Sequence, residues 1–99
     1  MNYKIVYSDY ILDRNDKIRN ISDLKKIGAH SVEIFLKGGE NLNFLAQNLP
    51  DDMNYSVHPK TLGIDISSMD YEIRERSVDY HKKVIDFAEK INASYVVIH

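Results

Sequence analysis

Two histidines stand where parallel α/β proteins place functional groups, at the end of an apolar stretch. His58 ends the stretch Asn54–His58, and His99 ends Tyr95–His99. A polar residue at the carboxyl end of a buried parallel strand is how such folds present a site. One strand-end histidine is more often a hydrogen-bonded core or rim residue. Two of them on one face of neighbouring strands predict a shared site.

Strand periodicity places two more polar residues on the same face as the histidines. Because side chains alternate along a strand, counting by twos puts Ser8 and Glu33 on the face of His58 and His99. The opposite face collects Ile5, Val32, Ile34, Leu36, Tyr55, Val57, Val96 and Ile98. The apolar face must lie under helices, so we expect the four polar residues to line the uncovered face.

Composition narrows the chemistry that this face could perform. The net charge of −2 argues mildly against a dedicated nucleic-acid surface, which usually carries a basic excess. There is no cysteine, so any metal would need histidine and carboxylate ligands. No stretch approaches the roughly 18 apolar residues of a membrane span. The start of the chain also lacks the apolar core of a signal peptide. We expect a cytoplasmic protein with no membrane partner.

Four strands and three helices alternate along the predicted fold. We expect strands at Tyr3–Ser8, Ser31–Leu36, Asn54–His58 and Tyr95–His99. The helices are expected at about Asn20–Ile27, at Leu42–Leu49 closed by Pro50, and from Tyr71 to about Ile91. The connection Lys60–Met69 is longer than most such loops, which is typical of a functional loop.

Local signals define the helix ends and faces. Asn20 and Asp70 are expected as amino-terminal caps, Gly28 as a stop, and Asn92 as a left-handed residue that ends the last helix. The buried stripe of that helix is predicted as Ile73, Ser77, Tyr80, Val84, Ala88 and Ile91. We expect the remaining histidines, His30 and His81, to be exposed to solvent.

A faint internal repeat supports this order. Ile27–Phe35 aligns with Ile91–His99, and each segment reads as a helix end, a left-handed residue, an alanine and a strand. Most of this likeness is what any two α/β units share. The alignment still fixes the strand phase, because Phe35 corresponds to His99 and Glu33 to Val97.

The predicted fold class is α/β, a parallel β-α-β-α-β-α-β chain forming a single partial domain over residues 1–99. A doubly wound sheet needs apolar residues on both faces, whereas a barrel keeps its helices outside and can carry polar groups inside. The mixed second face therefore favours the first half of a TIM (β/α)8 barrel. A full barrel takes roughly 250 residues, so this chain would supply less than half of one.

Several stretches resemble the xylose-isomerase-like TIM-barrel superfamily. They are Tyr55–Pro59, Ile64–Ser67, Glu72–Ser77 and Ala93–His99, together with Val32–Ile34. The superfamily holds sugar (phosphate) isomerases and epimerases and the endonuclease IV type of abasic-site nuclease. The resemblance implies that the chain is the amino-terminal portion of such a barrel. His58, His99, Glu33 and Ser8 would then bind a small sugar or sugar-phosphate substrate.

The resemblance also implies a divalent metal, Mn, Mg, Co or Zn, in the full barrel. Its main ligands and the catalytic base would lie beyond His99, so no catalytic residue is assigned, and we expect no tight metal binding by this chain alone. The first hypothesis is an isomerase or epimerase that moves a proton next to a metal-polarised carbonyl. The isolated 99-residue chain is expected to be inactive.

Two alternatives stay open. In a zinc-dependent abasic-site nuclease, His58 and His99 would be metal ligands, and Lys37 and Lys60 are the only obvious cations for DNA. In a non-catalytic half barrel, the open sheet edges would form a homo-oligomer, because an open wall exposes two unpaired edges.

Overall fold

The computed structural model describes residues 6–8 and 16–98 of the chain. In this part of the chain, strands and helices alternate along the sequence, and the strands form one parallel sheet. The elements are β1 (Tyr7–Ser8), α1 (Lys17–Lys26), β2 (Ser31–Phe35), α2 (Leu42–Asn48), β3 (Asn54–His58) and α3 (Tyr71–Lys90). The strands are ordered β1-β2-β3, and both neighbouring pairs are parallel. The predicted parallel α/β class is therefore confirmed for these strands.

The expected fourth strand is reduced to a short pairing beside β3. Val96 forms an isolated parallel bridge with Val57. The bonds Val57 N–H to the Tyr95 carbonyl (3.1 Å) and Val97 N–H to the Val57 carbonyl (3.0 Å) form this bridge. The next bond of the ladder would need an N–H on residue 59, which is a proline. Pro59 therefore stops the pairing that the sequence pattern extends to His99.

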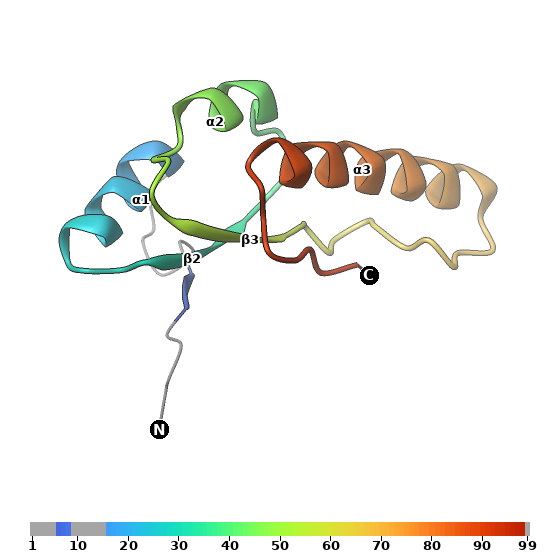
Figure 1. Cartoon of the computed structure of the whole chain (residues 1–99). Helices are drawn as coiled ribbons and strands as arrows, with labels where there is room; N and C mark the ends of the chain where they lie inside the picture. Colours follow the sequence, from blue (N-terminus) through green and yellow to red (C-terminus); the bar gives the residue numbers. More distant parts are fainter. Residues whose placement is uncertain (1–5, 9–15, 99) are drawn as a thin grey trace.

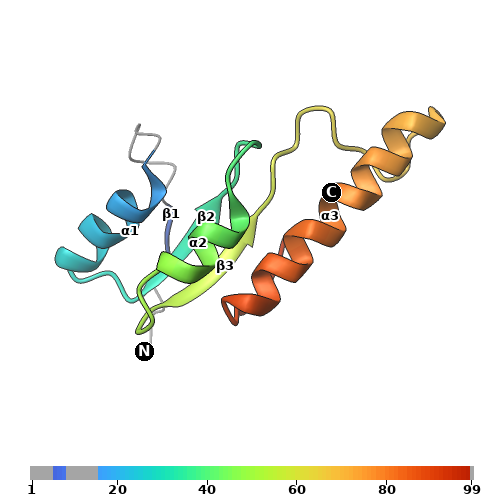
Figure 2. The ribbon, with the colours of Figure 1, turned by 90° about the horizontal axis from the view of Figure 1, so that it is seen from above.

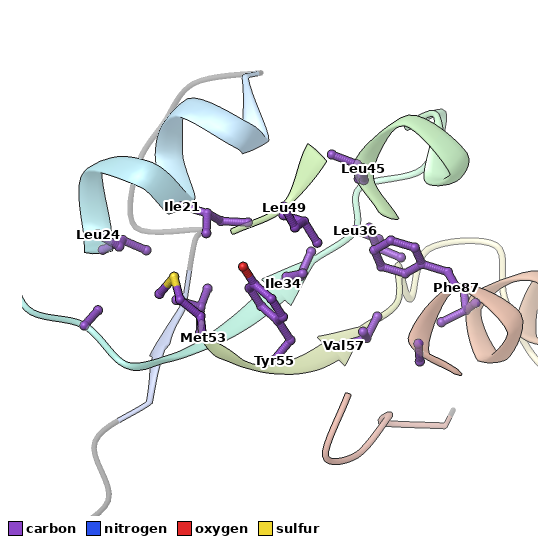
Figure 3. Packing of buried hydrophobic residues seen from close by; sticks show 14 residues of the cluster. Ile21, Leu24, Ile34, Leu36, Leu45, Leu49, Met53, Tyr55, Val57 and Phe87 are labelled. Atoms are coloured by element: carbon purple, nitrogen blue, oxygen red, sulfur yellow. The ribbon is translucent and has the colours of Figure 1, made fainter. Parts of the chain in front are cut away.

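All three helices lie on one face of the sheet, as Figure 1 and the view from above in Figure 2 show. The buried core contains α1, α2 and α3 residues together with alternate residues of β2 and β3 (Figure 3). Its members are Ile21, Leu24, Ala29, Val32, Ile34, Leu36, Leu45, Leu49, Met53, Tyr55, Val57, Val84, Phe87 and Ala88. The predicted helix-facing positions of β2 and β3 are thus confirmed.

The last predicted helix-facing residue departs from this pattern. Val96 packs against the core, but Ile98 is 48% exposed. Ile98 follows the last backbone hydrogen bond to β3, and only about half of its side chain is covered. Ile5 and His99 lie outside the described residues.

The start of α1 differs from the prediction. Asp16, not Asn20, is the cap, because its side chain accepts the backbone N–H of Arg19 at 3.1 Å. Asn20 lies inside the helix and is buried. Asp70 is confirmed as the cap of α3, since its carboxylate accepts the N–H groups of Glu72 and Ile73.

Helices α1 and α3 end in the same way. Gly28 (φ +97°) follows α1 and Asn92 (φ +54°) follows α3, so both adopt positive φ. The next N–H bonds back across the end, from Ala29 to the Leu24 carbonyl and from Ala93 to the Ala88 carbonyl. This is the Schellman arrangement, which closes the last helical turn. The aligned repeat therefore corresponds to a repeated helix end.

The buried face of α3 contains a residue that we expected in solvent. Its buried residues are Ser77, His81, Val84, Phe87 and Ala88. His81 is only 5% exposed, and neither of its ring nitrogens has a hydrogen-bond partner among the described residues. The expectation of an exposed His81 is wrong, because its place in the helical turn decides its burial. His30 is exposed, as expected. In the described residues we also find no helix with the length and apolarity to span a bilayer.

Candidate functional site

A row of polar residues crosses the sheet on the face opposite the three described helices. Ser8 pairs in register with Glu33, and Glu33 pairs with Ser56. The strand neighbours Val32 and Tyr55 are in the helix-facing core, so alternation turns the polar row to the other face. The structure therefore brings together two of the predicted site residues, Ser8 and Glu33.

His58 lies in the next row towards the carboxyl end of the strands. Its ring stacks on Phe35, with centroids 5.1 Å apart and planes 17° from parallel. Nδ1 lies 3.1 Å from the carbonyl oxygen of Pro59. A carbonyl can only accept, so Nδ1 carries the proton, and in the neutral ring Nε2 is an acceptor. From strand spacing and rise, His58 is roughly 8 Å diagonally from Glu33.

His99 lies outside the described residues, so its predicted place beside His58 stays a prediction. Val97 is the last residue before it with a backbone hydrogen bond to β3, from its N–H to the Val57 carbonyl. The metal role predicted for His58 and His99 stays a prediction as well.

Ser56 also belongs to this row, although the sequence alone did not lead us to name it as a site residue. Its Oγ is buried and has no hydrogen-bond partner among the described residues. The strand phase places Ser56 between Glu33 and His58, and this signal could have found it. A hollow of about 10 Å³ next to Ser56 is far smaller than a sugar. The polar row is thus no closed pocket: Ser8, Glu33 and His58 are partly exposed, whereas Ser56 is covered.

The larger hollows lie on the helix side of the molecule. One of about 420 Å³ lies between the start of α2 and the carboxyl-terminal half of α3, and one of about 400 Å³ lies between α1 and α2. Neither is lined by Ser8, Glu33 or His58. They are grooves between surface helices, and we place the candidate site on the sheet face because the polar residues converge there.

The described residues do not fit a metal centre. Among residues 6–8 and 16–98, no three histidine, aspartate or glutamate side chains come close enough to hold an ion. Glu33 and His58 alone provide fewer ligands than a zinc site needs.

The loop after β2 forms a compact turn at the carboxyl end of the sheet. The backbone N–H groups of Lys37 and Gly38 donate to the two carboxylate oxygens of Glu40, at 2.8 and 2.9 Å. Lys60, just beyond β3, lies against Gly38. Its backbone N–H donates to the hydroxyl of Tyr80 on α3 at 3.0 Å. These contacts join the ends of β2 and β3 to α3.

Burial raises the pKa of the Tyr80 hydroxyl, the hydrogen bond from Lys60 lowers it, and the charge of Glu40 raises it further; the net shift is upward. The phenol therefore stays protonated at neutral pH and supplies Lys60 with a neutral partner. Tyr80 was predicted only as a buried helix residue. Its link to Lys60 joins positions that are 20 residues apart, which no local pattern reveals.

Comparisons of the chain with protein-family models, with curated proteins and with solved structures found no match. The arrangement of the side chains therefore carries the functional argument.

Proposed function

We propose that this chain is the sugar-binding wall of a (β/α)8 barrel, the amino-terminal half of a sugar (phosphate) isomerase or epimerase of the xylose-isomerase-like kind. The observation that carries the proposal is the row Ser8–Glu33–Ser56 on the helix-free face, with His58 one row further towards the carboxyl ends. In barrels this is the face and the end where substrates bind.

The sheet order and the helix placement support a barrel wall. The described strands follow in sequence order, the segment around Val96 pairs next to β3, and the three described helices cover the same face. A doubly wound sheet would carry helices on both faces. A barrel wall leaves its inner face to the substrate, which matches the polar row.

The side chains of the row suit a polyhydroxyl ligand. The Glu33 carboxylate can accept hydrogen bonds from two neighbouring hydroxyls, and Nε2 of His58 can accept a third. The stacked rings of Phe35 and His58 offer an apolar surface to the C–H groups of a sugar. In the whole barrel, a divalent metal held by residues outside this set would polarise the substrate carbonyl. The described residues bind and orient the sugar.

The test is a titration of the ¹⁵N-labelled chain with D-fructose, followed by NMR. We expect amide shifts at Glu33, Ser56 and His58 in the millimolar range, and we expect Glu33→Gln to reduce them severalfold. The matched control is Glu75→Gln, because Glu75 is exposed on α3. Shifts confined to the grooves between the helices, or none in a folded chain, would overturn the proposal.

A second experiment addresses the nuclease alternative. A short duplex with an abasic site and, separately, Zn²⁺ are titrated into the same sample. The net charge of −2 supports the sugar over the DNA ligand. Stoichiometric zinc uptake that His58→Ala abolishes would favour the nuclease.

A further inference from the structure

The peptide unit that joins Pro59 to Lys60 has a hydrogen-bond partner at each end. Its N–H, on Lys60, donates to the hydroxyl of Tyr80 on α3 at 3.0 Å. Its carbonyl oxygen, on Pro59, lies 3.1 Å from Nδ1 of His58. The N–H and the C=O of a trans peptide point in opposite directions, and the described chain has no cis peptide. One rigid peptide plane therefore connects a residue of α3 with the candidate site.

The orientation of this plane is restrained from the side of α3. Pro59 is fully buried and its ring fixes φ, but rotation about ψ would still turn its carbonyl. The bond from the Lys60 N–H to Tyr80 restricts that rotation. Nζ of Lys60 also lies 5.5 Å from the centroid of the Tyr80 ring, within the range of a cation–π contact. Tyr80 itself packs against the core, so the direction of the Pro59 carbonyl depends on a well-anchored side chain.

The Pro59 carbonyl in turn determines how the imidazole of His58 is presented. A neutral imidazole has two tautomers, and its terminal torsion has two broad minima that differ by a flip of the ring. The stack with Phe35, at 17° between the ring planes, restrains the plane of the imidazole but permits either flip. The carbonyl selects the flip that turns Nδ1 towards it and the tautomer with a proton on Nδ1. Nε2 is then the acceptor of the ring.

We propose that Tyr80 is a positioning residue for His58 and acts through the peptide plane between Pro59 and Lys60. It holds the tautomer in which Nε2 accepts a hydrogen bond. His58 then recognises a hydroxyl group and discriminates against a carbonyl or ether oxygen, which can only accept. The identity of the ligand rests on the proposed function, whereas the tautomer of His58 is a property of the chain alone and is measured without a ligand.

The test observes the ring nitrogens of His58 in the ¹⁵N-labelled full chain by long-range ¹H–¹⁵N correlation NMR. The spectra are recorded at about pH 8.5, where an ordinary histidine is neutral. His58→Gln identifies the signals among those of the four histidines. We expect a protonated Nδ1 and an unprotonated Nε2. Tyr80→Phe keeps the ring but removes the acceptor, so it should lower the ratio of this tautomer to the other by about two- to tenfold, the effect of one neutral hydrogen bond.

Tyr55→Phe is the matched control, because it removes another tyrosine hydroxyl with a backbone partner, the Pro50 carbonyl at 2.6 Å. It should leave the ring nitrogens of His58 and the affinity for D-fructose unchanged. Tyr80→Phe should weaken the binding of D-fructose by up to the same two- to tenfold factor. An amide spectrum that is unaltered outside residues 56–62 and 77–83 shows that Tyr80→Phe is folded.

The ring signals and the sugar titration separate this role of Tyr80 from the proposed function. A protonated Nε2 in the unaltered chain, or ring signals that Tyr80→Phe leaves unchanged, would contradict the positioning role even if D-fructose binds. If the tautomer of His58 depends on Tyr80 but D-fructose does not bind, the proposed function fails and the positioning role stands.

Discussion

Replacing Gly38 by alanine tests the contact between Lys60 and the turn after β2. Gly38 has a φ of +98°, and an alanine in such a left-handed conformation costs about 1–2 kcal/mol. The added Cβ would also lie 2.9 Å from Cδ of Lys60, so the lysine must move. Moving it costs about 1 kcal/mol through a strained rotamer and a lost cation–π contact. We expect Gly38→Ala to lower the free energy of unfolding by about 2–3 kcal/mol.

Gly28→Ala provides the matched control. Its φ of +97° is almost the same, but no heavy atom lies within 4 Å of the added Cβ. It should therefore cost only the backbone part, about 1–2 kcal/mol. Equilibrium urea unfolding followed by circular dichroism measures both variants. In a Lys60→Ala background, the excess cost of Gly38→Ala should vanish. An equal cost for the two glycines, or an excess that persists without Lys60, would refute the packing of Lys60 across Gly38.

Three other perturbations have expected outcomes. His81→Leu should raise the free energy of unfolding by about 1 kcal/mol in urea titrations, because two buried ring nitrogens without a partner are removed; a loss of stability would mean that the imidazole has a partner. Burial raises the pKa of the Tyr55 hydroxyl, so the folded chain keeps this proton when the unfolded chain loses it. Stability should therefore fall as pH rises above about 10, and Tyr55→Phe should flatten that fall in urea midpoints; an unchanged slope would argue against a buried phenol. The edge beside β3 exposes half of Tyr95 and Ile98, so light scattering should show a mass that increases with concentration. Ile98→Lys should weaken this association, and a constant monomer mass for the unaltered chain would contradict it.

Strand phase was the part of the fold most accessible from sequence. Counting by twos correctly separated Val32 and Val57, which pack under the helices, from Glu33 on the other face. It succeeded because a parallel strand has a fixed period of two and one strongly apolar set. The end of α3 was predictable for a similar reason, since few residues besides glycine tolerate positive φ and asparagine is one of them.

The errors arose where the choice depended on distant contacts. Asp16 and Asn20 both have side chains that can cap a helix. The helix begins after the earlier residue, Asp16, because this lets Ile18 pack against the core. The polar side chain of His81 predicts a surface position, but its place on the helix, four residues after Ser77 and three before Val84, turns it into the core. The sequence identifies Lys60 only as a cation. Its position cannot be predicted locally because it depends on the close approach of Gly38 from another turn.

The connections at the two rims of the sheet, where strands begin and where they end, differ in how much sequence change they would tolerate. From helix to strand, the chain turns within a few residues, and the bonds from Ala29 and Ala93 fix the reversals after α1 and α3. From strand to helix, residues 59–70 form a long connection with Leu62 and Met69 almost fully exposed. Insertions at the first rim would shift the register of the following strand, whereas the exposed residues of the long connection, such as Thr61, Leu62 and Met69, can be changed without repacking the interior. Directed evolution of new ligand preferences should therefore randomise these exposed residues and leave the short turns, Pro59 and Lys60 untouched.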